Sequence, residues 1–190
     1  TLPKNPYGQS KIMFEQYMLD LTANDSLTNV SVLRYFNPCG ADSSRLLREE
    51  LSHQSSNLFP MIIKTILKKH SLLEVYGNDY DTKDGTGLRD FIHVRDLVDG
   101  HIAALEYKSG DKNFDIFNLG SGKGYTVLEV TKEFENQLCD SIPYKLVNRR
   151  EGDIAISLSD ITKAKNVLKW NPKLTLIDMV KDTLSSHHLL

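Results

Sequence analysis

Cysteine is scarce in this 190-residue chain, which contains only Cys39 and Cys139. Two cysteines so far apart in the sequence do not form a disulfide framework, and they predict the reduced thiols of a cytoplasmic protein. The histidines show no ligand spacing either, since they are scattered through the chain or adjacent near its end: His53, His70, His93, His101, His187 and His188. We therefore expect no metal site.

The chain also lacks an excess of either charge and any long apolar run. Its net charge of −2 gives no general attraction to nucleic acids or to anionic membranes, so neither is expected as a partner. No apolar run approaches the roughly 18 residues that span a bilayer, and the first residues do not have the pattern of a signal peptide. With 40% hydrophobic residues, the sequence predicts a soluble protein of one domain or slightly more.

Helical and extended patterns alternate along the sequence. The apolar spacing predicts helices over 7–21, 58–69, 96–108, 161–168 and 176–184, and strands over 29–37, 72–77, 91–94, 114–119 and 143–147. Thr126 and Glu129 form a capping box that predicts the start of another helix. The alternation indicates an α/β fold with parallel connections.

Gly120, Gly122 and Gly124 lie between a predicted strand and a predicted helix, as in a phosphate-binding turn. The spacing does not fit, because the third position of a G-x-G-x-x-G motif is Tyr125 and Lys123 is followed by glycine. A tight turn between strand and helix is the favoured interpretation.

Tyr7 and Lys11 are one helical turn apart, just after Pro6, a residue suited to the first turn of a helix. Phe14 and Met18 continue the same face, so we expect that face to point toward a core or a cleft. A phenol with its usual pKa near 10 can transfer protons at neutral pH only with help, and a nearby ammonium favours the phenolate. The alternative is a core tyrosine beside a lysine that reaches solvent.

Several polar residues follow predicted strands or stand in loops, including Asn37, Asn57 and the "RREGD" segment at 149–153. Arginine presents a planar fork that matches paired phosphate oxygens, so Arg89 with Arg149 or Arg150 could hold a diphosphate. Taken one at a time, each arginine could equally form an ordinary surface salt bridge.

Five segments together carry a family resemblance: "NPYGQSK", "LRYFNPCGA", "GNDYDTKDGTGLRDFIHVRDLVDGH", "NLGSGKGYTV" and "RREGD". They resemble the second half of the UDP-glucose 4-epimerase family, within the extended short-chain dehydrogenases/reductases. One stretch departs from the family, because residues 42–57 read "DSSRLLREELSHQSSN" where members have a glycine-rich loop.

The resemblance implies a remnant of a doubly wound Rossmann-type parallel sheet plus a smaller carboxy-terminal substrate-binding domain. Residues 1–42 would be the carboxy-terminal part of the NAD-binding domain, with the Y-x-x-x-K helix and the following strand. Residues 43–190 would be mainly the UDP-sugar domain, with 91–120 contributing a strand and a helix back to the first. Because the sequence holds no G-x-x-G-x-x-G turn for NAD, it looks like a carboxy-terminal fragment, and the complete enzyme would be a homodimer.

The resemblance also implies an isomerase of galactose metabolism that works through tightly bound NAD and a 4-keto sugar. Tyr7 would take the proton of the sugar 4-hydroxyl, Lys11 would favour the phenolate and hold the nicotinamide ribose, and Phe36 would pack near the nicotinamide. The UDP-sugar contacts it implies are Asn37, Asn57, Leu58, Val75, Tyr76, Arg89, Arg150, Asp153 and Ser157. For Phe36, Leu58 and Val75, packing in the core is an equal alternative.

At Ser157, family members with a bulky tyrosine admit only UDP-glucose and UDP-galactose. The small serine implies room for the N-acetyl group of UDP-GlcNAc and UDP-GalNAc. Two other functions stay open: a nucleotide-sugar dehydratase or decarboxylase of the same superfamily, and a remnant that turns nothing over. The second is favoured for the isolated 190 residues.

Overall fold

The computed structural model describes residues 3, 5–24, 28–52, 56–108 and 113–190. Its helices are α1 (Pro6–Asn24), α2 (Leu58–Ile66), α3 (Val94–Glu106), α4 (Val127–Leu138), α5 (Thr162–Val167) and α6 (Leu176–Ser186). Its strands are β1 (Val30–Tyr35), β2 (Asn37–Cys39), β3 (Leu73–Tyr76), β4 (Leu88–His93), β5 (Phe114–Leu119), β6 (Gly124–Thr126), β7 (Tyr144–Val147) and β8 (Ile156–Ser157). The α/β class predicted from the alternation is confirmed.

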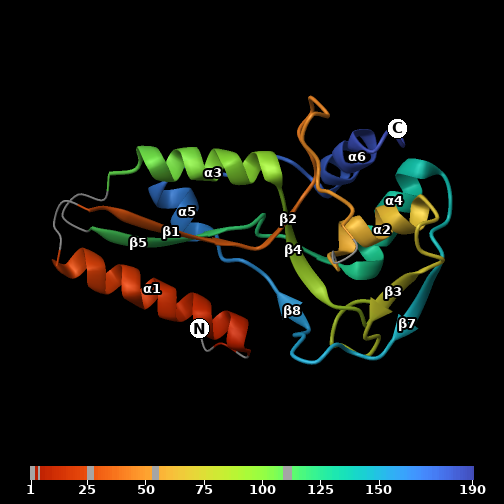
Figure 1. Ribbon diagram of the computed structural model, residues 1–190, viewed down its shortest axis with the longest axis horizontal. Coiled ribbons are helices and arrows are strands. Elements are labelled where there is room, and N and C mark those ends of the chain that lie inside the picture. The colour runs from red at the N-terminus through yellow and green to blue at the C-terminus, as the bar shows by residue number, and fades with distance from the viewer. Residues whose placement is uncertain (1–2, 4, 25–27, 53–55, 109–112) are drawn as a thin grey trace.

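One end of the molecule is a sandwich of helices around a pair of strands. β1 and β5 run parallel, in register from Val30 opposite Phe114 to Tyr35 opposite Leu119. α1 lies on one side of this pair, and α3 with α5 on the other (Figure 1). Phe117 and Leu119 are fully buried and pack in one core cluster with Trp170. This is the two-sided covering typical of parallel strands.

The other end contains short strands and the remaining long helices. β4 pairs with β2 and β8 in parallel and with β6 in the antiparallel sense, while β3 pairs in parallel with β7. α2, α4 and α6 gather beside them (Figure 1). Phe59, Phe134 and Met179 belong to a second core cluster, in which the Phe59 and Phe134 rings meet edge to face at 5.1 Å.

Most predicted elements form close to their expected bounds, and the Thr126–Glu129 capping box is present with both of its hydrogen bonds. The strand predicted over 29–37 differs, because the chain changes partner near Phe36: β1 pairs with β5, and β2 pairs with β4. β4 begins at Leu88 rather than at Phe91, since its first residues, Leu88 to Asp90, pair with β6, and Leu88 and Arg89 also pair with β8.

The buried face of α1 is not the one we expected. Tyr7 and Phe14 are 71% and 60% exposed, so of the two predicted surroundings, a core or a cleft, the core is wrong for these residues. The helix instead turns Glu15 toward β1, where its carboxylate takes a paired hydrogen bond from the Arg34 guanidinium, and it buries Thr22. This pairing holds the pKa of Glu15 below its usual value, mainly through the hydrogen bond from Arg34.

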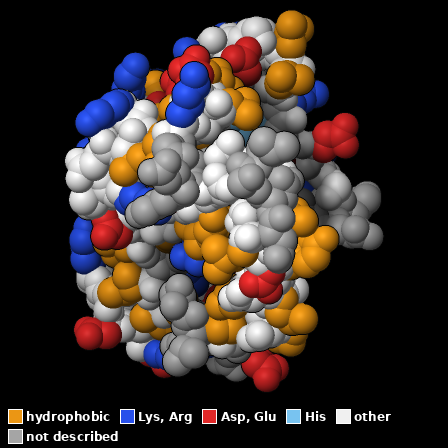
Figure 2. All heavy atoms as spheres, turned by 90° about the vertical axis from the view of Figure 1, so that its left-hand side faces the viewer, with side chains coloured by type: hydrophobic (Ala, Val, Ile, Leu, Met, Phe, Trp, Pro, Cys, Tyr) orange, Lys and Arg blue, Asp and Glu red, His pale blue; other side chains and the backbone are white. Residues whose placement is uncertain are grey.

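Hydrophobic side chains reach the surface at the end of the molecule that carries the last turns of α1 and α3 (Figure 2). The exposed apolar residues of these two helices include Met13, Tyr17, Ile102 and Leu105. Within the described ranges, no helix combines the length and the apolar character needed to cross a membrane.

Candidate functional site

The Tyr7–Lys11 pair lies in the first two turns of α1. The Asn5 side chain accepts a hydrogen bond from the backbone N–H of Gly8 at 2.8 Å, which caps the start of this helix. The Lys11 ammonium nitrogen lies 5.0 Å from the centroid of the Tyr7 ring, a cation–π distance. The structure thus brings the pair together on an exposed face, where both polar groups are accessible.

Arg89, Asp153 and Ser157 come together where β4 meets β8. Arg89 is in register with Ser157, and its guanidinium nitrogen Nη2 lies 3.8 Å from the Asp153 carboxylate. Its Nη1 donates to the backbone carbonyl of Leu88 at 2.9 Å. These contacts hold the arginine fork at the start of β4.

The two consecutive arginines of "RREGD" have different surroundings. Arg149 donates through Nε to the Asp79 carboxylate at 2.7 Å, and its guanidinium carbon lies 4.1 Å from the Tyr80 ring centroid. Arg150 stacks on Tyr76 instead, with its guanidinium carbon 3.8 Å from the ring centroid. Of the two, Arg150 is the better candidate for a diphosphate, because Arg149 already has a carboxylate partner.

Asp90 fixes the loops around this cluster. Its fully buried carboxylate accepts hydrogen bonds from the backbone N–H groups of Ser121, Gly122 and Ser159 and from both serine hydroxyls. Because Ser159 follows β8 by two residues, this carboxylate sets the position of β8 beside β4. It also sets the glycine-containing turn that we interpreted as structural rather than phosphate-binding.

Among the described residues, the remaining predicted ones form no hydrogen bond or ion pair with these arginines. Phe36 is half-buried where β1 ends, and its backbone N–H donates to the Leu119 carbonyl at 3.2 Å. Asn37 is exposed at the start of β2. The Asn57 side-chain amide lies 3.4 Å from the Glu49 carboxylate, just before α2.

Two predicted contacts belong at least partly to the core. Val75 is fully buried, so its side chain packs in the core and only its backbone could face a ligand. Leu58 is half-buried and packs against the same core cluster. For the Val75 side chain, core packing, the alternative to a UDP-sugar contact, is therefore what the structure shows.

Sequence reasoning missed the groups that support the site. Asp79 and Tyr80 were part of a loop interpreted only as turn-rich, yet they hold Arg149. Asp90 directly precedes the apolar run that begins at Phe91. A charge at the edge of a buried strand was the available signal.

His93 is a second buried group that sequence reasoning left aside. Its Nδ1 accepts from the backbone N–H of Arg95 at 3.1 Å, so Nε2 is the atom that donates to Asp182 on α6, also at 3.1 Å. Burial lowers the pKa of His93, and the nearby Asp182 carboxylate partly opposes this shift.

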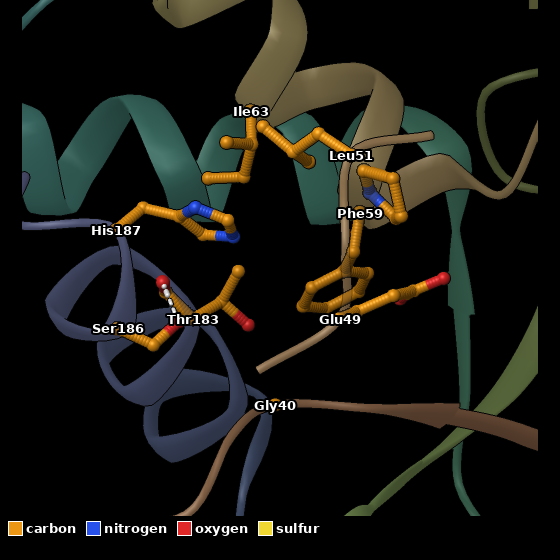
Figure 3. Close-up of a pocket in the computed structure, with 9 residues that line it drawn as sticks. Gly40, Glu49, Leu51, Phe59, Ile63, Thr183, Ser186 and His187 are labelled. Atoms are coloured by element: carbon orange, nitrogen blue, oxygen red, sulfur yellow. Dashed lines mark hydrogen bonds between the residues drawn. The ribbon is translucent and has the colours of Figure 1, made fainter. Parts of the chain in front are cut away.

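Two small hollows are found among the described residues. One, between α2 and the end of α6, encloses about 10 Å³, room for about one water molecule; Figure 3 shows His187 and Phe59 on its opposite sides. The other, of about 50 Å³, lies beside Lys123 and Lys173. None of the predicted site residues lines either of these hollows. Among the described residues, no His, Cys, Asp and Glu side chains gather as a metal site requires.

Comparison with known proteins gives a consistent result. The UDP-glucose 4-epimerase of Pasteurella multocida is 47% identical over 94% of this chain and 53% of its own length, and that of Bacillus subtilis is 46% identical over the same shares. The crystal structure of the Bifidobacterium longum UDP-glucose 4-epimerase, in complex with NAD⁺ and UDP, superposes with a TM-score of 0.93 and 41% identity. It is matched over 99% of this chain and 56% of that one.

The chain thus spans about half the length of the curated relatives it matches. The family model for the NAD dependent epimerase/dehydratase family matches residues 1–120, which is more than half of the sequence. This chain belongs to the NAD dependent epimerase/dehydratase family.

Proposed function

We propose that these residues form the sugar-binding and proton-transfer part of a UDP-glucose 4-epimerase. The observation that carries the proposal is that one chain contains two groups of residues. The first is the Tyr7–Lys11 pair, and the second is Arg89, Arg150 and Asp153. The first pair suits proton transfer at a sugar hydroxyl, and the second group suits a nucleoside diphosphate. The similarity to UDP-glucose 4-epimerases supports this combination.

In this proposal, the Tyr7 phenol exchanges a proton with the 4-hydroxyl of the sugar. The Lys11 ammonium, 5.0 Å from the ring centroid, stabilises the phenolate that forms. A pocket that holds the sugar loosely lets the 4-keto intermediate turn over, so carbon 4 would take the hydride back on its opposite face while Tyr7 returns the proton to the 4-oxygen. The affinity must then come from the nucleotide.

UDP is proposed to lie across the β3, β4 and β8 region. Arg89 and Arg150 bind the diphosphate, while Asp153 orients Arg89 from 3.8 Å. The uridine would lie beside the Tyr76 ring, and its remaining contacts would be the Leu58 side chain, the Val75 backbone, Asn37 and Asn57. Ser157, half-buried opposite Arg89, would border the 2-substituent of the sugar.

The residues present fit part of an NAD molecule. Tyr7 and Lys11 offer an exposed hydroxyl and an ammonium, and the half-buried Phe36 offers an aromatic surface. They suit the nicotinamide and its ribose, whereas the 190 residues contain no G-x-x-G-x-x-G turn for the cofactor's diphosphate. NAD⁺ held there would supply the acceptor for the hydride of sugar carbon 4.

We also propose the domain division 1–42 and 43–190, with 91–120 contributing to both. The pairing of β1, within 1–42, with β5, within 91–120, supports it. A homodimer of the complete enzyme is part of the same proposal.

The experiment uses a chimera, in which the part of the Bacillus subtilis relative that this chain does not match precedes Thr1. We expect it to convert UDP-galactose to UDP-glucose with bound NAD⁺, followed by a coupled assay. The 190-residue chain alone should bind UDP in a calorimetric titration. A chimera that folds and binds UDP but forms no UDP-glucose would favour the dehydratase or decarboxylase alternative or a non-catalytic domain.

A further inference from the structure

The Tyr76 ring is fixed on β3 and carries an arginine on one face. Its hydroxyl donates to the Glu74 carboxylate at 2.7 Å, and Glu74 pairs with Lys145 of β7 at 2.8 Å. The guanidinium carbon of Arg150 lies 3.8 Å from the ring centroid, which is stacking distance. The Tyr76 ring is therefore held in place with the Arg150 guanidinium stacked on one of its faces.

Arg150 differs from its neighbour in what it can still bind. Arg149 donates to both the carboxylate and the backbone carbonyl of Asp79, so it is engaged within the protein. In the part of the chain that the structure describes, Arg150 forms no ion pair with a carboxylate. The fork of Arg150 can move to an anion without breaking a salt bridge.

One face of an aromatic ring accepts one flat partner at a time. In the proposed function, the nucleobase contacts the Tyr76 ring and the diphosphate contacts Arg150, yet in this structure the two side chains stack on each other. A base that stacks on this face must displace the guanidinium. A nucleoside has no anionic group to bind the displaced Arg150 guanidinium, whereas a nucleoside diphosphate carries the anion that this arginine binds.

We propose that Arg150 is a specificity-determining residue that makes nucleobase binding conditional on a diphosphate, by occupying the Tyr76 ring until an anion draws it away. This inference depends on the proposed function, because it assumes a uridine site at Tyr76. The same side chain then weakens uridine binding and strengthens UDP binding. A contact residue that only attracts phosphate would not affect uridine.

The test compares uridine and UDP by isothermal titration calorimetry on the 190-residue chain, as wild type and as Arg150→Ala. The variant should bind uridine about two- to fivefold more tightly, the range of an exposed cation–π contact that the base no longer displaces. It should bind UDP at least about tenfold more weakly, because a charge-assisted contact is lost. Arg149→Ala is the matched control and should not tighten uridine binding.

A second measurement needs no variant. Saturating pyrophosphate should raise the uridine affinity of the wild-type chain about two- to fivefold, because the anion removes Arg150 from the ring. If Arg150→Ala leaves uridine affinity unchanged or lowers it, or if pyrophosphate has no effect in the wild type, the role proposed for Arg150 is wrong, while UDP binding still supports the proposed function. A wild-type chain that does not bind UDP overturns both the proposed function and the role proposed for Arg150.

Discussion

The hydroxyl and the backbone N–H of Ser159 both donate hydrogen bonds to the carboxylate of Asp90, and the N–H does so at 3.1 Å. The two residues are 69 positions apart in the sequence, and Asp90 is fully buried. This contact ties the segment that carries Arg150, Asp153 and Ser157 to the strand that carries Arg89. The proposed binding surface therefore depends on a carboxylate that does not itself belong to it.

Asp90→Asn should lower the free energy of unfolding by about 2–4 kcal/mol. The amide NH₂ would face the N–H and hydroxyl groups that now donate to the carboxylate, so at least one buried donor would lose its acceptor. Urea unfolding followed by circular dichroism measures this loss. Asp99→Asn, on the exposed face of α3, is the matched control and should change stability little. Equal losses for the two variants would show that the Asp90 contacts are not what holds these loops.

Stability should fall as the pH drops below about 6.5, partly because of His93. Its pKa in the folded protein is lowered by burial, so the unfolded chain binds the proton more readily. This contribution is present above the unfolded pKa and is lost as the pH falls through the lowered folded value. Unfolding curves between pH 5 and 7.5 should therefore show a smaller pH dependence for His93→Asn, which can retain the cap on the Arg95 N–H.

His70→Asn, which removes a histidine at an exposed position, is the control for this experiment. Part of the slope will remain in His93→Asn, since burial and the nearby Arg48 also lower the pKa of His187. An unchanged slope in His93→Asn would contradict the role given to the burial of His93.

The sequence predicted the helices and the buried strands because their apolar spacing depends on local residues alone. It did not predict the partners that decide the site: Arg149 pairs with Asp79 and Arg150 with Tyr76, across loops whose path no periodicity encodes. The face of α1 was misjudged for a related reason. The Glu15–Arg34 pair sets its rotation, and Arg34 is on a different element.

Two glycines allow the loop geometry around the arginines to be tested. Gly77 and Gly152 both have a positive φ, +78° and +81°, but a Cβ at Gly77 would lie 2.4 Å from the Tyr80 ring, whereas at Gly152 it would meet nothing within 4 Å. Gly152→Ala should cost about 1–2 kcal/mol from backbone strain alone. Gly77→Ala should cost about 1–3 kcal/mol more, because the buried ring must shift. Urea unfolding of both variants gives the comparison, and equal losses would mean that Tyr80 is not held in place.

Tyr7→Phe in the chimera should lower turnover at least about 100-fold and leave UDP affinity nearly unchanged, because only the proton-transfer group is removed. Arg150→Ala should do the reverse and act mainly on UDP binding. Steady-state kinetics with calorimetry of UDP separates the two effects. Near-normal turnover in Tyr7→Phe would exclude Tyr7 as the proton-transfer residue.

Ser157 should decide whether N-acetylated sugars fit. It is a small, half-buried residue opposite Arg89, and the proposed function places it at the 2-substituent of the sugar. We expect the chimera to interconvert UDP-GlcNAc and UDP-GalNAc as well as the hexoses, and Ser157→Tyr to abolish the first reaction by steric exclusion while sparing the second. Chromatography of both substrate pairs measures this.

Ile156→Tyr is the matched control for Ser157→Tyr, because neighbouring side chains on a strand point to opposite faces and Ile156 is exposed. It adds the same aromatic group to β8, so any general disturbance of the strand should appear in both variants, whereas loss of the N-acetylated substrates alone should appear only at Ser157. If the unsubstituted chimera epimerises the hexoses but not the N-acetylated sugars, a residue other than 157 closes the pocket.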